Sequence, residues 1–121
     1  MFRVNQPQQI TIAQAAERGY TDLVRDNVMK VDPTIENNRA IRDASFNGHT
    51  EIVKYLLSNP LVDPNAENSD ALLSAIANGH TDIVQLLIAD KRTKIPSNVL
   101  DIALENERED ILEILRNRIS S

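Results

Sequence analysis

Hydrophobic residues are spaced along this chain with the periodicity of short helices. Two segments carry a narrow apolar stripe rich in alanine: Ala40, Ile41 and Ala44, then Ala71, Leu72, Ala75 and Ile76. Each is followed by a segment with a broader aliphatic stripe: Ile52, Val53, Leu56 and Leu57, then Ile83, Val84, Leu87 and Ile88. Residues three or four positions apart share one side of a helix, so each segment predicts one amphipathic helix.

Glycine separates the two helices of each pair, and the pairs repeat along the chain. The sequence has three glycines, Gly19, Gly48 and Gly79, each opening the pattern Gly-Tyr/His-Thr-acid-aliphatic-Val. They are 29 and 31 residues apart, and a degenerate copy without glycine begins at Glu107, 28 residues further on. Asp-Pro recurs at residues 32–33 and 63–64 with the same period. Regular recurrence of this kind is the signature of a repeat protein.

Each repeat predicts a turn, a short helix, a glycine turn, a second helix and an extended link. One such helix pair cannot bury its own apolar stripe, but stacked pairs bury it against each other. We therefore expect an all-α solenoid forming one domain, residues 1–121, with repeats at approximately 9–35, 36–66, 67–96 and 97–118. The glycines fit a helix C-terminus that requires a positive φ.

The repeat resembles the ankyrin repeat. Residues Gly48 to Leu57 match the family motif Gly-His-x-Glu-Ile-Val-x-x-Leu-Leu almost throughout, and Gly79 to Ile88 match it as well. The first half of the motif is eroded, because residues 39–44 keep only its isoleucine and alanine. The period is shorter than the usual ~33 residues, which implies short β-turn fingers between the units. The resemblance covers roughly residues 9 to 118.

The outer two repeats depart from the pattern in ways that indicate end caps. Asp26 and Asn27 stand where leucines belong, so we expect that unit to be poorly ordered. In the last repeat Glu107 replaces glycine, and the final helix is rich in charged residues. Terminal repeats need a polar outer face. These caps and the short tails favour a complete protein over a fragment.

Composition and charge exclude several classes of protein. The chain has 121 residues, 41% of them hydrophobic, no cysteine and a net charge of −5. Nucleic-acid binding is not expected, because a binder of phosphate needs a basic surface. No apolar run approaches the ~20 residues of a membrane span. We expect a cytoplasmic monomer, able to reach the nucleus by diffusion, with no membrane association.

No set of residues suggests catalysis, so the chain is not expected to be an enzyme or to bind a cofactor. His49 and His80 occupy equivalent turns and could be metal ligands or general bases. We interpret them as residues that make a capping or turn hydrogen bond, since a zinc site needs three or four converging ligands. Residues 91–94, Lys-Arg-Thr-Lys, form the one basic cluster. We interpret it as a solvated loop after a helix, with a nuclear address or a phosphate contact as the alternative.

By the resemblance, the function is to bind another protein on a concave surface formed by the first helices of the units. The residues expected there are Arg39, Asp43, Phe46, Asn47, Asp70, Ser74, Ala77, Asn78, Asn98, Ile102 and Glu105. Phe46 is either an interface anchor or a packing residue against the next unit. Acidic and amide side chains there suggest a partner with a basic or mixed surface. An adaptor or inhibitor is expected; a structural segment of a longer chain, or an enzyme with a hidden site, are the alternatives.

Overall fold

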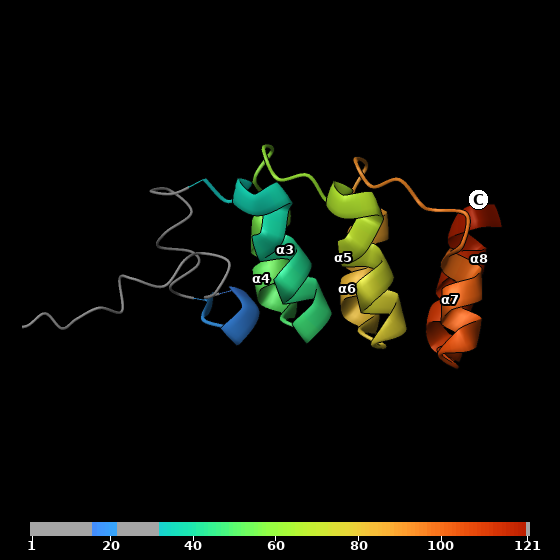
Figure 1. Cartoon of the computed structure of the whole chain (residues 1–121). Helices are drawn as coiled ribbons and strands as arrows, with labels where there is room; N and C mark the ends of the chain where they lie inside the picture. The colour runs from blue at the N-terminus through green and yellow to red at the C-terminus, as the bar shows by residue number, and fades with distance from the viewer. Residues whose placement is uncertain (1–15, 22–31, 121) are drawn as a thin grey trace, which may run out of the picture.

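A computed structural model of the chain describes residues 16–21 and 32–120, and it shows a row of stacked helix pairs (Figure 1). The helices are α3 (Ile35–Asn47), α4 (Thr50–Leu57), α5 (Ala66–Ala77), α6 (Thr81–Ala89), α7 (Val99–Glu105) and α8 (Glu109–Ser120). The two described ranges contain no strand. The predicted all-α solenoid of stacked helix pairs is therefore confirmed. The expectations for Asp26 and Asn27 fall outside the described residues.

The core lies between the pairs and is built from the predicted apolar stripes. The stripes of α3 and α5 are at most 1% exposed, and Ile52, Val53 and Leu56 of α4 are equally buried. Helix α3 packs on α5, α5 on α7, α4 on α6 and α6 on α8. Each stripe is thus covered both within its own pair and by the next one. Alanines 44, 75 and 103 are completely buried, which lets neighbouring helices approach closely.

The starts of α3 and α5 are left-handed, which the sequence analysis did not predict. Glu36, Asn37 and Asn38 have φ of 54° to 61°, and the equivalent residues 67–69 have φ of 56° to 65°. The right-handed helices begin only at Arg39 and Asp70. A left-handed turn is costly for most residues, but asparagine tolerates it better. In the sequence, this turn corresponds to Asn37-Asn38 and to the equivalent pair Asn68-Ser69.

Neighbouring units touch at their glycine turns. The glycine of one unit lies against the histidine that follows the glycine of the next unit. Gly48 has a φ of +78°, and a side-chain carbon added there would lie 2.8 Å from the ring of His80. His80 Nε2 lies 3.0 Å from the carbonyl oxygen of Phe46, and His49 Nε2 lies 2.7 Å from that of Glu17. Since a carbonyl only accepts, Nε2 donates in both bonds. Both histidines do form hydrogen bonds, but neither side chain caps its own helix, and their partners are carbonyls of the preceding unit.

The last unit keeps this arrangement with different residues. Arg108 replaces histidine, and its Nε and Nη2 donate to the carbonyl of Ala77 at 3.2 and 3.0 Å. Glu107 replaces glycine but has the same left-handed conformation, with a φ of 57°. The exposed residues of α8 are polar or charged, apart from Ile119, which is 51% exposed. Helix α7 leaves Leu104 54% exposed, so the predicted polar cap is incomplete.

The interpretation of residues 91–94 as a solvated loop is wrong for Arg92. Its Nη1 donates to the carbonyl of Val62 at 2.6 Å, and its Nη2 to that of Leu57 at 2.7 Å. Leu57 ends α4, so the guanidinium neutralises the negative end of that helix. Asp90 pairs with Arg92 at 2.7 Å and holds it in place. Lys91 and Lys94 are exposed.

Candidate protein-binding surface

Helices α3, α5 and α7 lie side by side along one face of the molecule, with α4, α6 and α8 behind them (Figure 1). We call the outer sides of these three helices the first-helix face. It holds the predicted binding residues, which are exposed or half-buried: Arg39, Asp43, Phe46, Asn47, Asp70, Ser74, Ala77, Asn78, Asn98, Ile102 and Glu105. The apolar stripe on the opposite side of each helix is buried in the core.

Ion pairs order the charged side chains over α3. Arg39 Nη1 lies 3.0 Å from a carboxylate oxygen of Glu36, and Arg39 Nε lies 3.0 Å from one of Asp43. These two hydrogen bonds are the main cause of a raised pKa for Arg39. Arg42 reaches Asp70 on α5 at 3.8 Å, which ties the first two helices of the face together. The basic side chains over α3 are therefore occupied by acids of the same surface.

Arg42, on the first-helix face, also stabilises the left-handed turn of α3. Arg42 Nε donates to the carbonyl of Asn37 at 3.0 Å, and its Nη2 donates to that of Glu36 at 2.8 Å. The side-chain amide of Asn37 donates to Glu67 at 2.6 Å, so the turn is also linked to the next unit. Hydrogen bonds from a charged guanidinium are stronger than neutral ones. Arg42 thus orders the end of the face nearest the loops.

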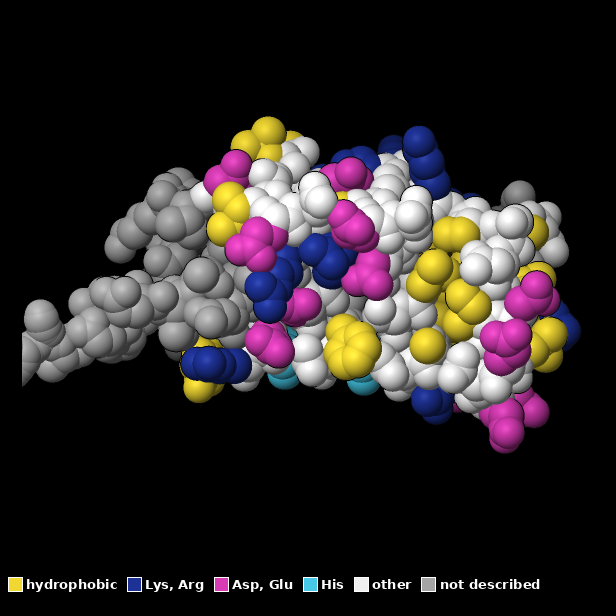
Figure 2. All heavy atoms as spheres, viewed as in Figure 1, with side chains coloured by type: hydrophobic (Ala, Val, Ile, Leu, Met, Phe, Trp, Pro, Cys, Tyr) yellow, Lys and Arg dark blue, Asp and Glu magenta, His cyan; other side chains and the backbone are white. Residues whose placement is uncertain are grey.

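Hydrophobic side chains break the charged pattern at two places. Phe46 is 56% exposed near the C-terminal end of α3, and its side chain is not part of the core. Between α5 and α7, hydrophobic side chains gather on the surface (Figure 2). Leu73 on α5 and Ile102 on α7 are half-buried. Exposed aromatic side chains such as Phe46 are the kind of feature that anchors a protein partner.

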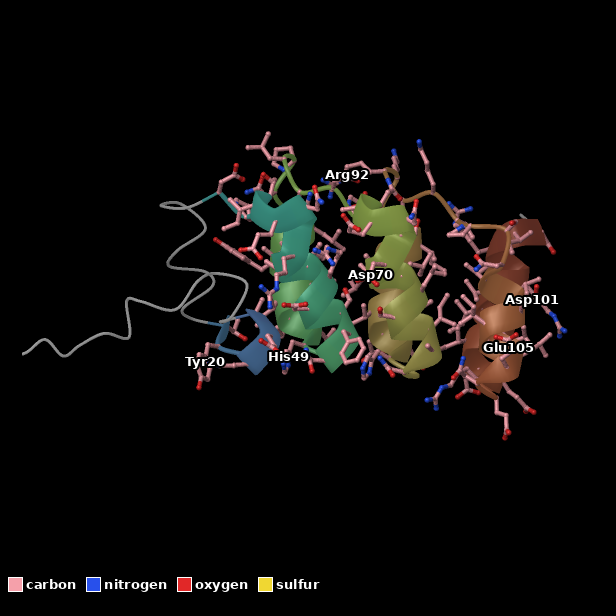
Figure 3. All side chains as sticks on the ribbon, in the orientation of Figure 1. Tyr20, His49, Asp70, Arg92, Asp101 and Glu105 are labelled. Carbon is pink, nitrogen blue, oxygen red and sulfur yellow. The ribbon has the colours of Figure 1, made fainter. Side chains whose placement is uncertain are left out.

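The acidic side chains of the face outnumber the basic ones. Along the described part of α3, α5 and α7 it carries two arginines and six acids: Arg39, Arg42, Glu36, Asp43, Glu67, Asp70, Asp101 and Glu105. Asp70 lies on the α3 side of α5, and Asp101 and Glu105 lie along α7 (Figure 3). Within the described ranges Asp101 and Glu105 have no basic partner. The α7 end of the face is therefore the more negative end.

Several residues of this face were missing from the sequence prediction, among them Glu36 and Glu67 near the starts of α3 and α5. Arg42, Leu73 and Asp101 occupy equivalent positions on α3, α5 and α7, and each is exposed or half-buried. The periodicity that selected Arg39 and Asp43 places Arg42 on the same side of the helix. The signal was thus present, but the contact of Arg42 with the next unit required the structure.

The other candidate residues do not form a chemical site in the described part of the chain. Residues 16–21 and 32–120 contain no group of three or more histidine or acidic side chains able to hold a metal ion. No helix among these residues is long and apolar enough to cross a membrane. His49 and His80 are engaged with backbone carbonyls of the preceding unit, as described above.

Comparisons with known proteins agree with this architecture. The family model "Ankyrin repeats (3 copies)" matches residues 12–99 and 44–120. Among 19 matching chains of solved structures is one from the crystal structure of the yeast ribosomal protein Rps3 in complex with its chaperone Yar1. It is 23% identical, the alignment covers 93% of each chain, and the TM-score is 0.70. A search of curated proteins gave no match.

Proposed function

Since the chain belongs to the family of ankyrin-repeat proteins, we propose that it is a non-catalytic module that holds a partner protein on the first-helix face. The observation that carries this proposal is the row of charged and aromatic side chains on α3, α5 and α7, of which the charged ones on α3 and Asp70 on α5 are ordered by ion pairs. A surface that is already ordered loses little conformational entropy when a partner binds. The solved structure of similar fold is itself a complex of two proteins, which supports a protein as the partner.

The charge of the face favours a basic or mixed partner. Arg39 and Arg42 are engaged with acids of the same surface, so Asp101 and Glu105 are left to meet cations from outside. Charge complementarity of this kind acts mainly on the rate of association and on the choice of partner. An adaptor and an inhibitor would use the same face. We place the protein in the cytoplasm, with diffusion into the nucleus, and take it to act as a monomer.

The test begins with a partner identified by mass spectrometry after co-purification with the full chain. Its affinity is then measured for the wild type and for Glu105→Lys on the first-helix face. A matched control is Glu51→Lys on α4, an acid that is also exposed but belongs to a helix behind the first-helix face. We expect Glu105→Lys to lower the affinity for a basic partner by about tenfold, and Glu51→Lys to change that affinity by less than about twofold. Equal effects of both variants would contradict binding on this face, as would retention of binding by Phe46→Glu combined with Glu105→Lys.

A further inference from the structure

The C-terminal end of the solenoid has an apolar surface that its inner units keep covered. Leu104 on α7 is equivalent to Ile76 on α5, yet Ile76 is completely buried and Leu104 is 54% exposed. The difference arises because α7 covers α5, while no described element covers α7 (Figure 1). Leu100 is half-buried, although its equivalent, Leu72, is also completely buried. The positions that pack between units inside the array are thus exposed to solvent on α7.

This surface is hollowed, and acids outnumber arginines by four to two among the charged residues of its rim. A hollow of about 620 Å³ lies between α7 and α8, with Ala103, Leu104 and Leu112 among its lining residues. Its charged lining residues are Glu107, Arg108, Glu109, Asp110, Glu113 and Arg116. The guanidinium of Arg108 is occupied by the carbonyl of Ala77. Acidic and hydrophobic side chains lie next to one another at this end (Figure 2).

A further unit of the same kind does not fit this end in the register of the inner units. At Gly48 and Gly79 a side-chain carbon would lie within 2.8 and 2.9 Å of the His80 ring and of the Arg108 guanidinium. Glu107 has that carbon and a carboxylate beyond it, so the corresponding ring of a next unit would collide with it. A second copy packed end to end would bring the acidic rims of two chains together, which is unfavourable.

We propose that this end, lined by Leu104 and Leu112 and rimmed by Glu107, Glu109 and Glu113, binds a basic amphipathic helix of a partner protein. The helix lies on the side of α7 and α8 that faces away from α5 and α6, where the next helix pair of a longer array would lie. Its apolar residues cover Leu104, and its lysine or arginine side chains meet the acidic rim. A cation of the helix pairs with the carboxylate of Glu107, which is exposed at this end. This site is separate from the first-helix face.

The test uses a fluorescently labelled amphipathic peptide of about 18 residues, with a leucine stripe at helical spacing flanked by lysines. A second peptide carries glutamate at every lysine position. Fluorescence anisotropy with the full chain should give binding of the lysine peptide, and at least about tenfold weaker binding of the glutamate peptide. Leu104→Glu should lower the affinity for the lysine peptide by about tenfold or more. The matched control Phe46→Glu changes a side chain of similar exposure on the first-helix face and should leave the affinity within about twofold.

Charge reversal provides an independent check. Glu109→Lys combined with Glu113→Lys should reverse the preference, so that the glutamate peptide binds more tightly than the lysine peptide. Circular dichroism establishes that each variant is folded. The proposal is overturned if neither peptide binds up to about 1 mM, a concentration that corresponds to very weak affinity. It is also overturned if Phe46→Glu weakens binding as much as Leu104→Glu, or if sedimentation shows the chain associating with itself through Leu104.

Discussion

Phe46 is a residue whose role in binding can be separated from a role in folding. Its side chain is 56% exposed and lies outside the core, so its removal opens no cavity. We expect Phe46→Ala to change the free energy of unfolding by less than about 0.5 kcal/mol, measured by urea denaturation. A loss above about 2 kcal/mol would show that the ring packs against a neighbouring unit and would remove it from the binding surface.

Asp90 gives the protein a contribution to stability that depends on pH. Its hydrogen bond with the Arg92 side chain lowers the pKa of Asp90, which is only 16% exposed, below the usual value near 3.8. A carboxylate with a lowered pKa in the folded state stabilises the protein above the unfolded pKa. That contribution is lost as the pH falls through the folded value. Burial acts in the opposite direction on this group but is the smaller effect.

The prediction compares the wild type with Asp90→Asn. At pH 7 the variant should be less stable by about 1 kcal/mol, because a charged hydrogen-bond acceptor is replaced by a neutral one. The difference should shrink as the pH falls below about 4 and disappear when Asp90 is protonated in both states. Urea denaturation midpoints of both proteins between pH 7 and pH 2 measure it. A difference that stays constant across this range would contradict the role given to the ion pair.

At the scale of the helix pair, the turn between the two helices is the element most sensitive to a single added carbon. Gly48→Ala places a side chain at a φ of +78° and 2.8 Å from the ring of His80. We expect the variant to lose about 1–3 kcal/mol of unfolding free energy through strain and displacement of the ring. Thermal denaturation followed by circular dichroism measures the loss.

Glu107 is the matched control for this prediction. It has the same left-handed conformation, with a φ of 57°, but it already carries a side chain, and that side chain is exposed. Glu107→Ala should therefore change stability by less than about 0.5 kcal/mol. If Gly48→Ala proves equally harmless, the contact between glycine and histidine does not constrain the stacking of the units.

For the whole molecule, stability depends on apolar contacts shared by neighbouring units. Leu56 is completely buried on α4, which packs on α3 within its pair and on α6 of the next. We expect Leu56→Ala to cost about 2–5 kcal/mol, because it leaves a cavity in a shared interface. In a stacked array such a loss weakens the neighbouring unit as well as its own. An unchanged urea midpoint would mean that α4 does not pack in the observed register.

The sequence by itself determined the helix pairs, their period and the side of each helix that is buried. This was possible because helical periodicity and glycine at positive φ are local properties, and repetition makes each of them visible several times. The predicted stripes of α3 to α6 are buried, apart from Leu57, which is half-buried. The same helical periodicity predicted the exposed side of α3, which carries Arg39 and Phe46.

Only the tertiary structure decided what the polar residues contact. Arg92 looked like one cation of a solvated loop, but it binds carbonyls some 30 residues earlier in the chain. Arg42 joins two units, and Leu104 is exposed where its equivalent Ile76 is buried. The physical reason is that a hydrogen bond or a burial depends on which unit lies next to a residue. That neighbour is fixed by the stacking of distant segments and not by the local pattern around the residue.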